Sequence, residues 1–123
     1  MNDTSNSQIS VHETQMRKGV LLYCVLLLLK DGKVYTSELI HFLRKAELIV
    51  VEGTLYPLLN RLAKEGLRDY EWQESEQGPP RKYYKTTAFG GVVEKHVAAS
   101  IKTLNQTIKN WDRLKNEKCL KIF

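Results

Sequence analysis

Hydrogen-bonding side chains recur along one side of a leucine-rich segment in the middle of the chain: Tyr56, Asn60, Arg61 and Lys64. An amide can form paired hydrogen bonds with the edge of a base, whereas guanidinium and ammonium groups suit phosphate oxygens. Thr54 adds a hydroxyl just upstream. This combination predicts a surface for double-stranded DNA. The alternative is an ordinary amphipathic helix with a solvated polar face.

A helix is needed to present these side chains together. The apolar positions are spaced by three, one and three residues and therefore fall on one helical stripe, made of Leu55, Leu58, Leu59 and Leu62. Pro57 lacks a backbone N–H and fits only the first turn, so the helix is expected to begin at about Gly53 or Thr54. Gly66 is expected to end it.

The segments 69–74 and 81–86 are rich in aromatic residues and alternate in character, and the turn-forming run Gln77–Pro80 separates them. A helix that leads directly into a hairpin is the outline of a winged helix-turn-helix. Arg81 and Lys82 follow two prolines and are the wing residues expected to contact DNA. Trp72, on the first of the two strands, is expected to be a packing partner rather than a stacking platform.

The spaced motifs of this region resemble the PadR family of bacterial transcriptional regulators. They are Gly53–Leu59, Arg61–Leu62, Lys64–Leu67, Gly78–Tyr84, Thr87 and Gly90. The resemblance implies a dimeric DNA-binding winged helix, usually a repressor, whose long C-terminal helix forms the dimer interface. It also implies that Tyr84 faces the core. The segment Lys33–Leu39 stands where most members carry a His-Gly-Tyr run, and Thr86 stands where a leucine is usual.

The N-terminal part divides into a polar and an apolar segment. Residues 1–14 are polar, lack the apolar stretch of a signal peptide, and are expected to form a flexible arm. Val20–Leu29 is an almost unbroken apolar run. A membrane-spanning helix needs about 20 apolar residues, so this shorter run predicts a buried core helix. The DNA-binding domain is then expected over 15–87.

A second helix is expected from Thr36 or Ser37, either of which could cap it. Its predicted inward face consists of Leu39, Ile40, Phe42 and Leu43. In a helix-turn-helix this helix crosses the phosphate backbone, so Arg44 and Lys45 could contact phosphates. Alternatively, both side chains are simply solvated.

Thr87 can cap a long last helix, expected over 88–118 and followed by a tail at 119–123. Its apolar positions alternate in spacing between four and three and form a heptad seam of Val97, Ile101, Leu104, Ile108 and Trp111. Such a seam predicts a two-fold homodimer; the alternative is that it packs on the first helix of its own subunit. Trp111 is expected to be dimer core rather than a plate for a small-molecule effector. The sequence leaves open whether an effector binds at the dimer interface.

Composition narrows the class of protein. The chain has 19 basic and 14 acidic residues, a net charge of +5, which favours a polyanionic partner. The two cysteines are far apart and suggest no disulfide framework, which fits a reducing cytoplasm. We find no phosphate loop and no metal-ligand spacing, and expect neither enzyme activity nor a cofactor. The hypothesis is a mainly α, winged helix-turn-helix repressor; the alternative is a protein-interaction adaptor with the same fold.

Overall fold

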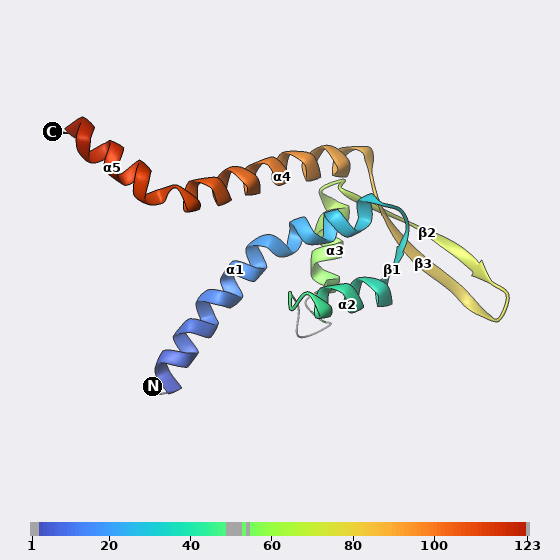
Figure 1. The fold of residues 1–123 in the computed structure, drawn as a ribbon. Helices are drawn as coiled ribbons and strands as arrows, with labels where there is room; N and C mark the ends of the chain where they lie inside the picture. The colour runs from blue at the N-terminus through green and yellow to red at the C-terminus, as the bar shows by residue number, and fades with distance from the viewer. Residues whose placement is uncertain (1–2, 49–52, 54, 123) are drawn as a thin grey trace.

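The structure is a computed structural model that describes residues 3–48, 53 and 55–122. In chain order its elements are α1 (Asp3–Lys30), β1 (Val34–Tyr35), α2 (Thr36–Lys45), α3 (Leu55–Lys64), β2 (Arg68–Ser75), β3 (Gly78–Thr86), α4 (Ala88–Lys109) and α5 (Trp111–Ile122). The strands form one antiparallel sheet in the order β1-β3-β2. In Figure 1, β2 and β3 project as a hairpin from one side of the helical body, whereas the outer parts of α1 and α4 diverge on the other side. The predicted winged helix-turn-helix is confirmed.

The hydrophobic core lies where the first three helices meet the inner part of the sheet. Its buried side chains are Leu21, Val25, Leu26, Leu29, Leu39, Leu43, Leu55, Leu59, Leu62, Leu67 and Tyr84. Full burial of one such leucine stabilises the fold by about 1.5–3 kcal/mol relative to exposure. Because α3 contributes three leucines to this core, its opposite face is held toward solvent.

Helix α1 begins at Asp3, so most of the segment expected to be a flexible arm is helical. The polar sequence has no apolar periodicity that would indicate a helix. It continues the core helix instead, and extending an existing helix avoids the cost of nucleation. Arg17 donates to Glu13 one turn away at 3.3 Å, which adds a small stabilisation on this exposed surface.

The second half of α1 is the predicted core helix. Cys24 is half-buried, and this burial raises the pKa of its thiol. None of the helices in the described part of the chain is both long enough and apolar enough to cross a membrane.

Helix α2 follows Tyr35 directly, so the predicted cap at Thr36 or Ser37 is wrong. The Glu38 carboxylate instead accepts a hydrogen bond of 3.2 Å from the Tyr35 backbone N–H. Leu39 and Leu43 are buried, as predicted, but Phe42 is 46% exposed. Phe42 lies on the edge of the inward stripe, where its ring contacts His41 rather than the core.

Helix α3 begins at Leu55, slightly later than predicted, and Thr54 lies outside the described residues. Gly66 has a φ of +75°, which confirms its predicted role at the helix end because glycine adopts this left-handed conformation without strain. The next residue but one, Arg68, is buried. Its guanidinium donates two hydrogen bonds, of 3.2 and 2.8 Å, to the Leu59 carbonyl and so fixes α3 to the start of the hairpin.

The hairpin is longer than predicted. Gly78–Pro80, expected in the turn, belong to β3, and only two residues separate the strands. Prolines are tolerated there because β1 pairs with β3 only at Tyr83 and Tyr84, so the outer part of β3 has a free edge. Tyr84 is buried, as expected, but Trp72 is 61% exposed and its predicted packing role is wrong. Figure 1 shows that the outer part of the hairpin formed by β2 and β3 extends beyond the helical body.

Candidate nucleic-acid interface

The exposed face of α3 carries the side chains predicted to contact DNA. Tyr56, Asn60, Arg61 and Lys64 are all exposed, whereas the leucine stripe is buried or half-buried. The helix therefore presents a phenol, an amide and two cations along one side. Thr54 was expected to join this set, but it lies outside the described residues.

Arg61 is engaged in an ion pair on the same helix. Its Nε donates to Glu65 Oε1 at 3.0 Å, and both side chains are exposed. An exposed pair of this kind stabilises a protein by only about 0.2–1 kcal/mol. Arg61 can therefore exchange the carboxylate for a phosphate at little cost.

An open groove of about 710 Å³ lies between α2 and α3. It is lined by Thr36, Ser37, Ile40, His41, Arg44, Lys45 and Tyr56. Two basic side chains and two hydroxyls thus lie beside Tyr56 of α3. Sequence reasoning placed Arg44 and Lys45 on the outside of α2, and the structure brings them next to α3.

On the wing, Arg81 points toward the beginning of α2. Its Nη1 donates a 3.2 Å hydrogen bond to the Tyr35 hydroxyl, and its guanidinium lies 5.1 Å from the centre of the Tyr35 ring. A smaller cavity of about 350 Å³ is lined by Tyr35, Thr36, Ser37, Arg81 and Lys82. Since Thr36 and Ser37 also line the larger groove, the two cavities adjoin. Seven polar residues that line one or both of these cavities are called the basic strip below. They are Tyr56, His41, Arg44, Lys45, Thr36, Ser37 and Arg81.

Lys82 lies on the other face of the hairpin. Alternation along β3 separates it from Arg81, and it pairs across the sheet with Trp72. Its Nζ is 4.2 Å from the centre of the Tyr70 ring and 5.9 Å from that of Trp72. The two predicted wing residues therefore both line the smaller cavity, but Arg81 contacts Tyr35 on one face of the hairpin and the Lys82 ammonium contacts the rings on the other.

The sequence profile described as the transcriptional regulator PadR-like family matches residues 25–96, more than half of the chain. The chain belongs to the PadR-like family of transcriptional regulators. The matched region includes the end of α1, the complete helix-turn-helix and wing, and the start of α4. A comparison with curated proteins gave no significant match.

Solved structures agree with this assignment. A PadR-like transcription factor from Bacteroides fragilis is 54% identical; the match covers 80% of this chain and 95% of that one, with a TM-score of 0.67. A PadR family transcriptional regulator from Eggerthella lenta DSM 2243 is 30% identical over 89% of this chain and 96% of that one, with a TM-score of 0.79. A PadR-like regulator from Bacillus cereus ATCC 14579 is 36% identical over 79% and 95%, with a TM-score of 0.70.

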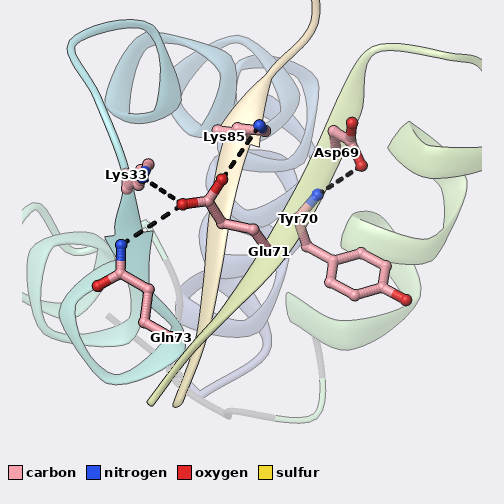
Figure 2. Close-up of polar contacts among 6 residues, drawn as sticks. All are labelled: Lys33, Asp69, Tyr70, Glu71, Gln73 and Lys85. Carbon is pink, nitrogen blue, oxygen red and sulfur yellow. Dashed lines mark hydrogen bonds and ion pairs between the residues drawn. The ribbon is translucent and has the colours of Figure 1, made fainter. Parts of the chain in front are cut away.

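The base of the wing in this PadR-like chain is held by a carboxylate cluster. Figure 2 shows Lys33, Gln73 and Lys85 converging on Glu71. The Lys85 Nζ is 3.3 Å from Glu71 Oε2, and Lys33 bonds the other carboxylate oxygen. These hydrogen bonds, that of Lys33 first, lower the pKa of Glu71 to about 2. Because the two lysines and the Gln73 amide come from the turn before β1, from β3 and from β2, Glu71 ties these three segments together.

Two residues of this region were not identified from the sequence. Arg68 is buried between α3 and the sheet, with its guanidinium 4.8 Å from the Tyr84 ring. Tyr35 lies beneath Arg81 and also bonds the Tyr83 hydroxyl. The hydrogen bonds from Tyr83 and then Arg81 lower the pKa of the Tyr35 phenol, because they favour its anionic form. Only the folded hairpin brings these groups together, so no spacing in the sequence indicates the contact.

The C-terminal region differs from the single helix expected over 88–118. Helix α4 ends at Lys109, and α5 runs from Trp111 through most of the expected tail. Asn110 has a φ of −104° and a ψ of 16°, which is outside helical geometry and separates the two helices. The uninterrupted heptad spacing therefore crosses a break in the backbone that the side-chain pattern does not reveal.

The seam is partly uncovered within the subunit. Leu104, Ile108 and Trp111 are 61%, 70% and 60% exposed. An ion pair joins the first part of α4 to α1, where the Lys30 Nζ lies 3.8 Å from the buried Glu94 carboxylate. The second half of the seam therefore does not pack on the first helix of its own subunit.

Proposed function

We propose that this PadR-like regulator is a cytoplasmic, sequence-specific DNA-binding protein that represses transcription as a homodimer on an inverted repeat. One observation carries the proposal: the basic strip is continuous from Tyr56 on α3, across the start of α2, to Arg81 on the wing. A helix-turn-helix places these three elements on one duplex. The net charge of +5 favours the same polyanionic partner.

Each side chain has a role that follows from its chemistry. Asn60 is the proposed base reader because its amide can both donate to and accept from adenine. Arg61 and Lys64 are proposed phosphate contacts beside it, with Tyr56 at the start of the helix and Thr54 two residues before Tyr56 in the sequence. Arg81 contacts the backbone from the wing. Lys82 attracts the DNA by its charge without touching it, since its ammonium group lies over the Tyr70 ring.

The exposed half of the seam supports the homodimer. Leu104 and Ile108 of α4 and Trp111 at the start of α5 lose unfavourable contact with water when a second copy covers them. A two-fold dimer would place two α3 helices on half-sites about 34–36 Å apart, one turn of DNA. The seam residues Val97, Ile101, Leu104, Ile108 and Trp111 are the proposed interface. A small-molecule effector at this interface would act by favouring one dimer geometry over another.

The alternative is an adaptor that binds another protein through the same fold. The exposed carboxylates Glu74 and Glu76 at the outer end of the wing favour it, because they repel phosphates there. A protein interface with an apolar centre would depend little on salt. DNA binding weakens with salt with a log–log slope of about −0.9 for each phosphate neutralised.

Fluorescence anisotropy over a salt series separates the two functions. The protein would be titrated with a duplex from its own upstream region and with a shuffled duplex of equal composition. A specificity ratio of about a thousand or more, with a steep salt slope, is the expected result. Equal and weak binding to both duplexes would contradict the proposal and support the adaptor.

A further inference from the structure

The Tyr35 hydroxyl oxygen accepts hydrogen bonds from two residues of β3. One comes from the Tyr83 hydroxyl and the other from Arg81 Nη1 at 3.2 Å. The two tyrosine rings also stack, with their centres 3.9 Å apart. The Arg81 guanidinium therefore contacts both the hydroxyl and the ring of Tyr35, and the Tyr35 ring packs in turn on the ring of Tyr83.

The backbone of Tyr35 is fixed as well. Tyr35 pairs with Tyr83 in the sheet and is the residue immediately before α2. Its N–H donates to the Glu38 carboxylate in the first turn of that helix. The side chain that holds Arg81 is therefore anchored to both the sheet and α2, and it sets the distance between the wing arginine and the start of α2.

We infer that Tyr35 is a positioning residue for Arg81, holding the guanidinium where a DNA phosphate between the wing and α2 would meet it. The inference rests on the proposed function, because it assigns a phosphate contact to Arg81. A free arginine side chain loses rotamer freedom when it binds a phosphate, and a preformed contact removes part of that loss. The bond to Tyr35 uses one of the five N–H donors, so others remain for the phosphate.

The shifted pKa values agree with this geometry. The hydrogen bond with Tyr35 raises the pKa of the Arg81 guanidinium, and the bonds from Tyr83 and Arg81 lower that of the Tyr35 phenol. Tyr35 and Arg81 therefore each favour the charged form of the other. The Tyr83 phenol also raises the pKa of Arg81, by a smaller electrostatic effect.

A double-mutant cycle on DNA binding tests the inference. The four proteins are wild type, Tyr35→Phe, Arg81→Ala and the double variant, each titrated with the specific duplex over a salt series. Phenylalanine keeps the ring and removes the bonded oxygen. Tyr70→Phe is the matched control, because this phenol lies on the other face of the hairpin (Figure 2). Thermal melts of every variant check that the fold is retained.

Arg81→Ala should weaken binding about tenfold and reduce the magnitude of the salt slope by about 0.9. Tyr35→Phe should weaken binding about threefold to fivefold, less than the loss of a direct hydrogen bond to a charged group, because Tyr35 acts on the phosphate only through Arg81. In the double variant the effect of Tyr35→Phe should disappear, since there is no guanidinium left to position. Tyr70→Phe should change neither the affinity nor the slope.

Two results would overturn the inference in different ways. If Tyr35→Phe weakens binding equally with and without Arg81, Tyr35 acts on its own or through the fold, and the DNA-binding function stands. If wild type shows no preference for the specific duplex and no salt dependence, the proposed function fails and the inference fails with it.

Discussion

Gly90, in the first turn of α4, lies so close to the Leu67 carbonyl oxygen that a Cβ atom on Gly90 would be 2.2 Å from it. The same Cβ would be 2.4 Å from the Thr86 hydroxyl oxygen. Thr87 closes this junction: its hydroxyl accepts from the Gly90 N–H at 2.9 Å and donates to the Gly66 carbonyl at 2.6 Å. The end of α3, the end of β3 and the start of α4 therefore meet with no room for a side chain.

Gly90→Ala should destabilise the fold by about 1–3 kcal/mol, because the neighbouring carbonyl belongs to backbone that cannot rotate away. Gly91→Ala is the matched control, since a Cβ there meets nothing within 4 Å. That substitution should be neutral or stabilise the helix by about 0.5–1 kcal/mol. Urea unfolding at one fixed protein concentration measures both. Equal effects of the two substitutions would show that the close approach does not limit packing.

The junction also explains a departure from the family pattern. Thr86 stands where a leucine is usual, and its hydroxyl lies 3.4 Å from the Leu67 carbonyl, to which it donates. Lys33, in the other departing segment, bonds Glu71. Both polar side chains thus have a partner far away in the sequence, and the Thr86 hydroxyl also lies 3.2 Å from the carbonyl oxygen of the adjacent Thr87.

The sequence predicted the structure correctly wherever one face of a periodic segment packs against the core. The leucine spacing of α3 and the glycine at its end predicted the recognition helix, and the resemblance placed Tyr84 inward. Prediction failed where the outcome depended on what covers a position. Trp72 is on the same face of the hairpin as Tyr84, yet it extends beyond the body and is exposed. A period-two pattern shows which face of a hairpin a residue occupies, but not whether the rest of the protein covers that face.

The candidate site shows the same limit. The types of side chain on α3 followed from the sequence, because one helix presents them all. Arg81 and Tyr35 are 46 residues apart, and their contact depends on the register of β1 with β3. The break at Asn110 was also missed, since a helical backbone can be interrupted while its apolar spacing continues.

The Glu71 cluster predicts a dependence of stability on pH. Its pKa is lowered from 4.5 to about 2, so the folded state binds a proton on this group less readily than the unfolded chain does. The stabilisation is therefore complete above the unfolded pKa and is lost as pH falls toward the folded value. Glu71→Gln should lower the urea midpoint at neutral pH, and its difference from wild type should narrow between about pH 5 and about pH 2.5.

Glu76→Gln serves as the comparison for Glu71, since Glu76 is an exposed carboxylate in the hairpin turn. It should change the midpoint little at any pH. A constant difference between Glu71→Gln and wild type over the whole acid range would show that Glu71 contributes by packing and not by its charge.

Asn60→Ala should relax specificity more than it reduces affinity. The ratio of binding to the specific and shuffled duplexes should fall about tenfold to a hundredfold, while the salt slope is unchanged because no charge is lost. Lys64→Ala should weaken both duplexes similarly and reduce the magnitude of the slope by about 0.9. Anisotropy titrations over a salt series measure both quantities. If Asn60→Ala weakens both duplexes to the same degree, Asn60 does not read a base.

Ile108→Glu should convert the proposed homodimer to monomer. Ile108 is the most exposed apolar residue of the seam, and a carboxylate there would be buried without a partner when two copies meet. Lys109→Glu introduces the same side chain one position away, off the seam, and should leave the dimer intact. Sedimentation velocity over a concentration series gives the oligomeric state of each variant. If both variants remain dimeric, the subunits associate through another surface, and the spacing of the two half-sites must be derived again from that geometry.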